Sequence, residues 1–238
     1  MPQGSHLRLN QFLASAGLGS RRSCERLIRD GLVWVNGKKI TSLATRVKSQ
    51  DQVICDGKEV RLKQEKIVIA FNKPRGFVCS KKSEGSFRSI YDLLPVEFKS
   101  LFYVGRLDAE SEGLLLLTND GYLAQQFSHP RYHVSKIYRA TLDKAFDFQK
   151  STRLLKGSWV EGKRAKFDAI HALSGKTVKV ILSQGIKRQI RQQFFQLGYE
   201  VKKLVRTQVG PILLDHLPAG KWRKLNLEEL KKLKKSFN

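Results

Sequence analysis

The run of four leucines from Leu114 to Leu117 is the feature that most constrains the fold of this chain. It lies in the stretch GRLDAESEGLLLLTNDG, residues 105–121. The run is too short to span a membrane, and it predicts a strand that is buried on both faces. Asp108 then lies in a turn that leads into the core. This aspartate either holds a charge at a defined position or only caps the turn, as Asp often does.

The charge balance predicts a polyanionic partner. The 238 residues include 45 Lys and Arg but only 21 Asp and Glu, a net charge of +24. Such a charge suits nucleic acid or an anionic membrane surface. We find no apolar run of about 18 residues, no signal peptide and no lipidation motif, so we favour nucleic acid. The last eleven residues can form a basic helix, with Asn226 and Glu229 spaced as a capping pair, which we expect to pack on its own domain.

The cysteines and histidines indicate neither disulfides nor a metal site. No Cys-x-x-Cys pair occurs among the three cysteines, Cys24, Cys55 and Cys79. This usage is typical of the reducing cytoplasm. His129 and His133 are four residues apart, but Pro130 between them argues against a helical metal-binding face. We therefore expect a cytoplasmic protein without a bound metal.

Residues 8–61 have the pattern of a compact first unit with two helices, a hairpin and a strand, within 9–16, 20–30, 32–40 and 51–57. Asn36 and Gly37 suit a type I′ turn in the hairpin. Four basic residues fall at the start of the second helix and at the hairpin tip: Arg21, Arg22, Lys38 and Lys39. They either hold a phosphate backbone or form a merely solvated basic face.

This stretch resembles the S4-type RNA-binding module of ribosomal proteins. The resemblance is carried by RLNQFLASAG, SRRSCERLIRDG, VWVNGKKI and the DQV near its end. It implies a domain over residues 7–64 that binds structured RNA. The charged segment 63–67 is expected to connect it to a second domain at 66–238. Residues 1–65 carry a net charge of +6 and the remainder +18, so both domains are basic.

The second domain has an α+β pattern. Its strand-like runs are KIVIAFNK, FYVG, GLLLLT, KIYRATL and TVKVILS, and its clearest helix covers 188–197, before Gly198. Strands and helices do not alternate strictly, and neither GxGxxG nor a P-loop is present, which argues against a doubly wound nucleotide-binding fold. We predict a mixed, mostly antiparallel sheet with flanking helices.

Asp108 is the most distinctive candidate for chemistry, partly by elimination. No serine lies in a GxSxG context. Glu110 and Glu112 are close in sequence but not obviously convergent with Asp108. Burial and RNA phosphates both disfavour an ionised carboxylate, whereas a nearby arginine favours it. Arg106 and Arg191 are the two candidates for that arginine.

The helix at 188–197 gathers cations at its start. Arg188 and Arg191 are three residues apart and are expected to share a face, with Lys187 beside them. A solvated surface helix is the alternative, but apolar residues at 190, 194 and 197 indicate that the opposite side is buried. Tyr138 in SKIYRATL could stack on a base removed from its helix, although a strand tyrosine is more often part of a core.

The motifs together resemble the ribosomal RNA pseudouridine synthases of the RsuA/RluB/RluF branch. The signature is VGRLDAESEGLLLLTNDGYLA, and three further stretches agree: FNKPRGFVCS at 71–80, SKIYRATL at 135–142 and ILSQGIKRQIRQQFFQLGYEVKKLVRTQVGPILL at 181–214. The resemblance covers nearly the whole chain. It implies isomerisation of uridine to pseudouridine in a flipped-out nucleotide, without a cofactor.

The resemblance also implies roles for single residues. Asp108 corresponds to the catalytic aspartate, and Arg191 to the arginine that pairs with it. Tyr138 corresponds to the tyrosine that stacks on the base and takes part in proton transfer at C5. Arg106 corresponds to the arginine that helps to hold the flipped-out state, and Leu182 to an apolar residue that lines the base pocket.

The chain departs from the family pattern near its last helix. Gln184 replaces the usual glutamate, which we expect to be harmless. Gln192 and Gln193 replace a basic residue and its neighbour, a change expected to loosen one phosphate contact without altering the chemistry.

Two alternatives remain open: a non-enzymatic RNA-binding assembly factor of the ribosome, and a nuclease or RNA glycosidase. For the enzyme, we expect a monomer acting on ribosomal RNA or a pre-ribosomal particle. The sequences of two motifs, SEGLLLLTNDG and HPRYHVSKIY, favour large-subunit over small-subunit RNA. The sequence does not decide whether the aspartate adds to C1′ or removes the C2′ proton.

Overall fold

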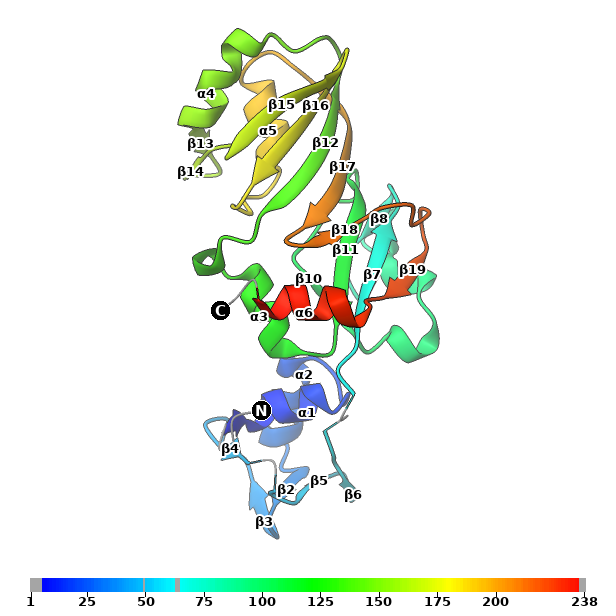
Figure 1. Cartoon of the computed structure of the whole chain (residues 1–238). Helices are drawn as coiled ribbons and strands as arrows, with labels where there is room; N and C mark the ends of the chain where they lie inside the picture. Colours follow the sequence, from blue (N-terminus) through cyan, green and yellow to red (C-terminus); the bar gives the residue numbers. More distant parts are fainter. Residues whose placement is uncertain (1–5, 49, 63–64, 236–238) are drawn as a thin grey trace. The chain divides into compact units, whose positions relative to one another are not determined.

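The chain folds into two units (Figure 1), Met1–Lys66 and Ile67–Asn238. The computed structural model describes residues 6–48, 50–62 and 65–235. Residues 63–64 of the expected connector and the last three residues of the expected C-terminal helix therefore lie outside the described residues.

The first unit consists of two helices and a small sheet, in the predicted order. The helices are α1 (Leu9–Ser15) and α2 (Arg21–Arg29), and the sheet order is β3 (Lys38–Ile40), β2 (Val33–Val35), β5 (Val53–Cys55) and β6 (Lys58–Glu59). A short pair, β1 (Leu7–Arg8) and β4 (Arg46–Val47), completes it. Asn36 and Gly37 both have positive φ, 48° and 76°, as a type I′ turn requires. The Ser20 side chain accepts a hydrogen bond from the Ser23 N–H and so caps α2.

The second unit is built on one mixed sheet. Its order, within the described residues, is β15 (Ala169–Ser174), β16 (Thr177–Leu182), β12 (Lys136–Leu142), β17 (Val201–Val209), β11 (Glu112–Thr118), β7 (Val68–Lys73) and β19 (Trp222–Lys224). In addition, β10 (Phe102–Val104) pairs with β11, and β18 (Ile212–Leu213) pairs with β17. The β11–β17 pair is parallel and the other described pairs of this sheet are antiparallel. The predicted mixed, mostly antiparallel α+β architecture is confirmed.

The leucine run lies in β11, which is covered on both faces. Leu114 and Leu116 pack in a core that includes residues of α3 (Gly121–Ser128) and α6 (Leu227–Lys235). Leu115 and Leu117 pack on the opposite face, under two 3-10 turns, Ile90–Leu93 and Val96–Phe98. All four side chains are at most 1% exposed. The uninterrupted apolar run is therefore explained by burial on both sides, as predicted.

Helices α4 (Ser151–Lys156) and α5 (Gln189–Phe195) lie at the β15–β16–β12 end of the sheet (Figure 1). Leu154 of α4 and Ile190 and Phe194 of α5 belong to one core cluster with Leu182 of β16. The predicted helix at 188–197 is shorter than expected. It begins after Arg188, because this residue has a left-handed conformation, φ 53°, which an α-helix does not continue.

The C-terminal helix α6 is capped as predicted. Asn226 Oδ1 accepts from the Glu229 N–H at 2.9 Å, and the Asn226 N–H donates to Glu229 Oε2 at 3.0 Å. Leu233 is buried in the core of the same unit, so α6 packs on its own domain. Among the helices of the described residues, none is long and apolar enough to cross a membrane.

Candidate active site

Asp108 lies in the segment that joins β10 to β11, residues 105–111, which we call the Asp108 turn. The Asp108 carbonyl accepts a hydrogen bond from the Ser111 N–H at 3.0 Å, and the side chain is half-buried. No hydrogen bond within the described part of the chain reaches the Asp108 carboxylate. The turn therefore forms without this side chain, which counts against the view that Asp108 only caps it.

Two buried cations hold the backbone of the Asp108 turn. Lys73, which is 0% exposed, donates from Nζ to the carbonyl oxygens of Ser111 (2.7 Å), Ala109 (3.4 Å) and Pro74 (3.0 Å). Arg206, which is 3% exposed, donates from Nη1 to the Arg106 carbonyl (3.4 Å). Its Nε donates to Leu114 at the start of β11 (2.7 Å). Each cation thus fixes the turn to a strand of the sheet.

These cations belong to one row of residues across the sheet. Gly113 pairs with Lys73 on one side and with Arg206 on the other, and Arg206 pairs with Tyr138. Register partners project from the same face of a sheet. The side chains of Lys73, Arg206 and Tyr138 therefore lie on the face that carries the Asp108 turn. Gly113 is required here, because its φ is 104° and an added Cβ would lie 2.3 Å from the Arg206 carbonyl oxygen.

A third cation, Arg191 of α5, reaches the same turn. Its Nη2 donates to the Glu110 carbonyl at 3.2 Å and its Nη1 to the Val201 carbonyl at 2.6 Å. Its nearest carboxylate is Glu110, with 3.9 Å between Arg191 Nε and Oε2. Arg188 Nη2 lies 3.1 Å from the same oxygen. The two arginines do share a target, although Arg188 precedes the helix.

The expected direct pair between Asp108 and Arg191 is not formed in this structure. The turn between Asp108 and Ser111 brings Glu110 toward α5 instead. Burial lowers the pKa of Arg191, and the negative charges of Glu110 and Asp108 oppose this shift, so Asp108 lies within electrostatic range of the guanidinium. The hydrogen bond from Arg188 lowers the pKa of Glu110, which the sequence analysis considered only as a carboxylate near Asp108.

Burial also shapes the other groups under the turn. It lowers the pKa of Lys73 to about 8, an effect that nearby Cys79, Asp108 and Glu112 partly oppose. Burial raises the pKa of the Cys79 thiol. The Cys79 sulfur donates to the Leu107 carbonyl at 3.4 Å and accepts from the Leu107 N–H at 3.5 Å, so it is a neutral contact beside Asp108.

Tyr138 joins the two core clusters on this face of the sheet. It is partly buried against the cluster that contains Leu182 and against the cluster that contains Leu107, the neighbour of Asp108. The predicted stacking residue Tyr138 therefore links the cluster of the predicted pocket residue Leu182 to the cluster that contains Leu107 of the Asp108 turn. Lys136, two residues before Tyr138, donates to the Ser183 carbonyl at 3.2 Å, and burial lowers its pKa to about 8.

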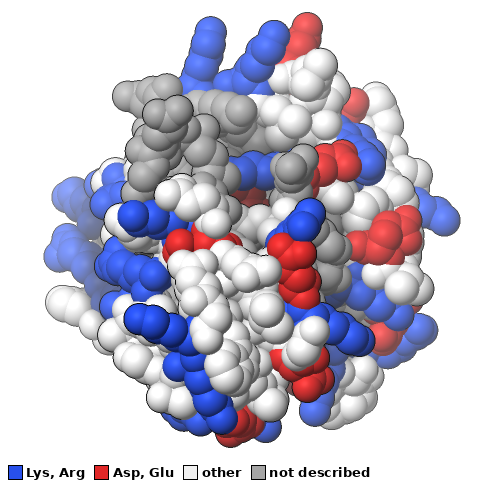
Figure 2. All heavy atoms as spheres, turned by 90° about the horizontal axis from the view of Figure 1, so that it is seen from below, with Lys and Arg blue, Asp and Glu red and all other residues white. Residues whose placement is uncertain are grey.

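The remaining predicted binding residues are exposed. Arg106 contributes its carbonyl to Arg206 while its side chain faces solvent, and Lys187 is exposed just before α5. In the first unit the exposed residues are Arg21, Arg22, Lys38 and Lys39. Figure 2 shows many Lys and Arg side chains at the surface, with acidic side chains interspersed.

The glutamines that depart from the family pattern hold neighbouring structure. Gln184 Oε1 accepts from the Lys166 N–H at 3.0 Å. Gln192 Nε2 donates to Glu161 Oε1 at 2.9 Å, and Gln193 Nε2 donates to the Ala165 carbonyl at 3.0 Å. Gln192 and Gln193 connect α5 to the hairpin of β13 (Ser158–Val160) and β14 (Lys163–Ala165), whereas the effect on a phosphate contact stays a prediction.

Sequence reasoning missed Lys73, Arg206 and Gly113. A signal was present in the sequence. Lys73 lies two residues after Phe71, and Arg206 lies two residues after Leu204, both at inward-facing positions of apolar strands. Lys and Arg are rarely buried fully unless they are paired. Within the described residues, no group of three or more His, Cys, Asp or Glu side chains could hold a metal ion.

Each of the two units of the chain matches a known protein family. Residues 67–196 match the family model described as RNA pseudouridylate synthase, and residues 7–53 match the S4 domain. An uncharacterized RNA pseudouridine synthase of Aquifex aeolicus is 38% identical over 236 residues, covering 97% of this chain and 94% of the relative. The chain therefore belongs to the RNA pseudouridine synthase family, whose members are isomerases acting on RNA.

Two further comparisons agree over nearly the full length. Ribosomal large subunit pseudouridine synthase B of Bacillus subtilis is 31% identical over 233 residues, with 95% of each chain covered. The crystal structure of a pseudouridylate synthase aligns with a TM-score of 0.70 at 28% identity, covering 95% of this chain and 99% of that one.

Proposed function

We propose that this protein converts a uridine of ribosomal RNA to pseudouridine, with Asp108 as the catalytic carboxylate. The observation that carries the proposal is the Asp108 turn itself. Lys73, Arg206 and Arg191 hold its backbone, while the carboxylate takes no part in building it. A fixed turn whose carboxylate makes no hydrogen bond to the described residues is suited to act on a substrate.

The reaction conserves all atoms. The N1–C1′ bond of uridine breaks, the uracil rotates while bound, C5 bonds to C1′, C5 loses its proton and N1 gains one. The Asp108 carboxylate either adds to C1′ or removes the C2′ proton, and both routes require it to be ionised. Lys73 and Arg191 place positive charge around the turn that carries Asp108.

The other site residues have proposed roles around the flipped base. Tyr138 stacks on the uracil and takes part in proton transfer at C5, and Leu182 lines the pocket. Arg106 holds the flipped-out state, and Lys187 and Arg188 bind nearby phosphates. Flipping costs a few kcal/mol, and phosphate contacts from both basic domains offset it. The four exposed cations of the first unit supply its share: Arg21, Arg22, Lys38 and Lys39.

Two buried donors support a site that is completed by a substrate. Within the described residues, Arg191 Nε and Arg206 Nη2 are buried and have no hydrogen-bond partner. Leaving such a group unsatisfied costs about 1–3 kcal/mol. Both guanidinium groups contact the Asp108 turn, so a uracil carbonyl, a phosphate or the Asp108 carboxylate in the RNA complex would satisfy them.

We further propose large-subunit ribosomal RNA as the substrate, a monomeric protein without a cofactor, and a cytoplasmic location. The name of the Bacillus subtilis relative supports the choice of RNA. The test is incubation of the purified protein with unmodified large- and small-subunit RNA transcripts, followed by chemical mapping of pseudouridine. We expect product at a defined uridine of the large-subunit RNA. Product only in the small-subunit RNA would overturn the choice of substrate.

The two alternative functions give different products in the same assay. A nuclease would produce strand scission and an RNA glycosidase would release free uracil, which a gel and chromatography detect. A non-enzymatic assembly factor would release no tritium from RNA labelled at uracil C5, whereas the proposed enzyme releases it with each turnover.

A further inference from the structure

A separate hairpin packs against α5, on a face of the helix other than the one that carries Arg191. It consists of β13 (Ser158–Val160) and β14 (Lys163–Ala165), which pair with each other outside the main sheet. Gln196 Nε2 donates to the Trp159 carbonyl at 2.9 Å, and Gln193 Nε2 donates to the Ala165 carbonyl at 3.0 Å. These bonds, together with the Gln192–Glu161 bond, hold the hairpin firmly on the helix.

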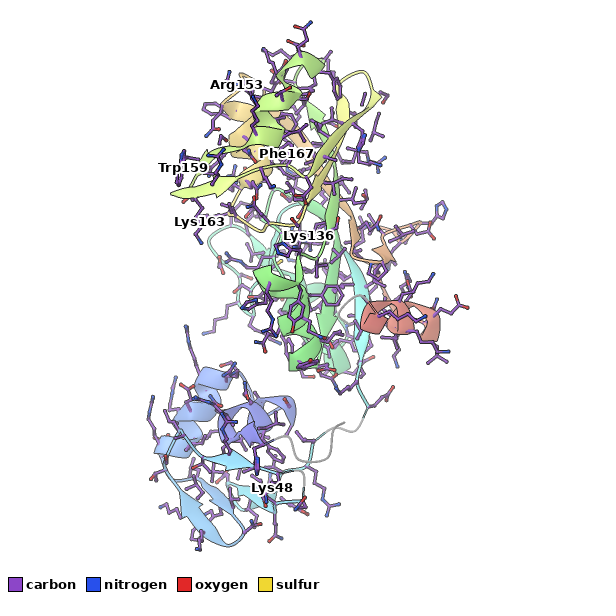
Figure 3. The ribbon with its side chains drawn as sticks, turned by 60° about the vertical axis from the view of Figure 1, so that its left-hand side comes forward. Lys48, Lys136, Arg153, Trp159, Lys163 and Phe167 are labelled. Atoms are coloured by element: carbon purple, nitrogen blue, oxygen red, sulfur yellow. The ribbon has the colours of Figure 1, made fainter. Side chains whose placement is uncertain are left out.

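This rigid hairpin presents a tryptophan to solvent. Trp159 is 67% exposed and pairs across the hairpin with Arg164, whose Nη2 donates to the Lys156 carbonyl at 3.1 Å. Figure 3 shows Arg153, Trp159 and Lys163 along the flank formed by α4 and the hairpin. An exposed tryptophan on a fixed backbone, next to cations, is the arrangement that a nucleobase can stack on.

A surface hollow of about 250 Å³ lies where α4, the start of the hairpin and the end of α5 meet. The hollow is lined by two cations, two amide side chains and no acidic residue: Arg153, Leu154, Lys156, Gly157, Ser158, Gln193, Gln196 and Leu197. Ser158, which lines the hollow, precedes Trp159, and Gln196, which also lines it, binds the Trp159 carbonyl, so the hollow reaches the backbone of the tryptophan. Positive charge and amide hydrogen-bonding groups thus lie next in the chain to an exposed aromatic side chain.

We propose that this hollow and Trp159 bind an unpaired nucleotide of the RNA substrate, outside the active site. The base stacks on the indole, the exposed Gln196 amide bonds the nucleotide, and Arg153 and Lys156 bind its phosphate. RNA suits this surface better than an apolar protein partner, because the lining is basic and polar. The proposal rests on the proposed function, since it assigns a second contact to the same RNA.

The position of α5 sets the distance of this contact from the target uridine. Arg191 reaches the Asp108 turn from one face of the helix, and Gln193 and Gln196 reach the hairpin from another. A helix with its side chains is about 10–12 Å across, which equals about three stacked nucleotides at roughly 3.4 Å each. The bound nucleotide therefore lies a few positions along the strand from the target.

The test measures RNA binding by the full-length Asp108→Asn protein, so that no turnover interferes. The probe is a fluorescently labelled single-stranded oligouridylate of about twelve nucleotides, and the readout is anisotropy. We expect Trp159→Ala to raise the Kd on the order of tenfold and Trp159→Phe to raise it only about twofold, because phenylalanine still stacks. Tyr122→Ala in α3, an aromatic of the same 67% exposure, serves as the matched control and is expected to change nothing.

The cations of the hollow are tested as a pair. Arg153→Ala with Lys156→Ala is expected to weaken binding more than Lys231→Ala with Lys235→Ala, which removes the same charge from exposed positions of α6. Equal effects of the two double variants, or equal Kd values for Trp159→Ala and Tyr122→Ala, would overturn the proposed site.

The same variants in the active protein separate this proposal from the proposed function. Trp159→Ala is expected to raise KM with kcat within about twofold. If the unsubstituted protein makes no pseudouridine but Trp159→Ala still weakens binding, the function fails and the contact stands. If product forms and Trp159→Ala binds like Tyr122→Ala, the contact fails and the function stands.

Discussion

The basic side chains of the first domain and those around the Asp108 turn are chemically alike but occupy opposite surroundings. Those of the first domain, Arg21, Arg22, Lys38 and Lys39, are exposed. Around the turn, Lys73 and Arg206 are at most 3% exposed and the Arg191 side chain is 13% exposed. Exposed cations bind phosphates through forces that salt screens. The buried ones donate to backbone carbonyls, and so they position the turn that carries the carboxylate.

The largest effect is expected from Arg191→Ala. This change removes a hydrogen bond to the Glu110 carbonyl and a positive charge near Asp108, and a single-turnover assay should show a rate lower by about a hundredfold. Arg188→Ala is the matched control, because Arg188 binds the same Glu110 carboxylate from an exposed position. Exposed ion pairs contribute about 0–1 kcal/mol, so it should change the rate only a few-fold. Equal losses in both variants would remove the distinction between buried and exposed arginines.

Lys73→Met is expected to have the next largest effect. It leaves the Ala109 and Ser111 carbonyls without their buried donor and should lower the rate about tenfold, with a loss of about 1–3 kcal/mol in the free energy of unfolding. Lys81→Met is the control, since Lys81 also donates to backbone carbonyls, those of Lys99 and Leu101. It should destabilise the protein without lowering the rate of the remaining folded fraction. An active, destabilised Lys73→Met protein would contradict a positioning role.

Replacing the four exposed cations of the first domain with alanine should weaken RNA binding and leave turnover unchanged at saturating RNA. A Kd series over salt concentration should show a slope reduced by about three, because each lost phosphate contact contributes about 0.7–0.9. An unchanged slope would show that these residues form only a solvated face. A lower rate at saturating RNA would break the division between binding and positioning.

The last comparison concerns the pH dependence of stability and not the rate of the reaction. Burial lowers the pKa of Lys73 and Lys136 to about 8 from the ordinary 10.5. Between these values the unfolded chain binds protons that the folded protein does not, so the free energy of unfolding rises with pH across this window. Relative to the Lys73→Met, Lys136→Met double variant, urea unfolding should show a gain of about 2 kcal/mol per lysine between about pH 8 and 10. Parallel pH profiles would contradict the burial of these charges.

Local pattern was sufficient to predict most of the architecture. The leucine run predicted a doubly buried strand, and the Asn36-Gly37 turn and the Asn226–Glu229 cap each formed as their residue types require. These features depend on a few neighbouring residues, so a single sequence contains the information. Local pattern predicts the first residue of a helix less accurately, as the left-handed Arg188 before α5 shows.

The candidate site was only partly predictable, because it is assembled by sheet register. Lys73, Gly113 and Arg206 are neighbours only because β7, β11 and β17 pair at those positions. No spacing along the chain reports that pairing. Spacing also does not report the conformation of the Asp108 turn. That conformation makes Glu110, and not Asp108, the carboxylate nearest Arg191.

The measurement that tests the catalytic assignment most directly is pseudouridine formation by Asp108→Asn under single-turnover conditions with saturating RNA. We predict unchanged RNA binding and no product above background, while Glu110→Gln, two residues away on the same turn, still forms product. Pseudouridine from the Asp108→Asn protein at a rate comparable to that of Glu110→Gln would contradict the role of Asp108.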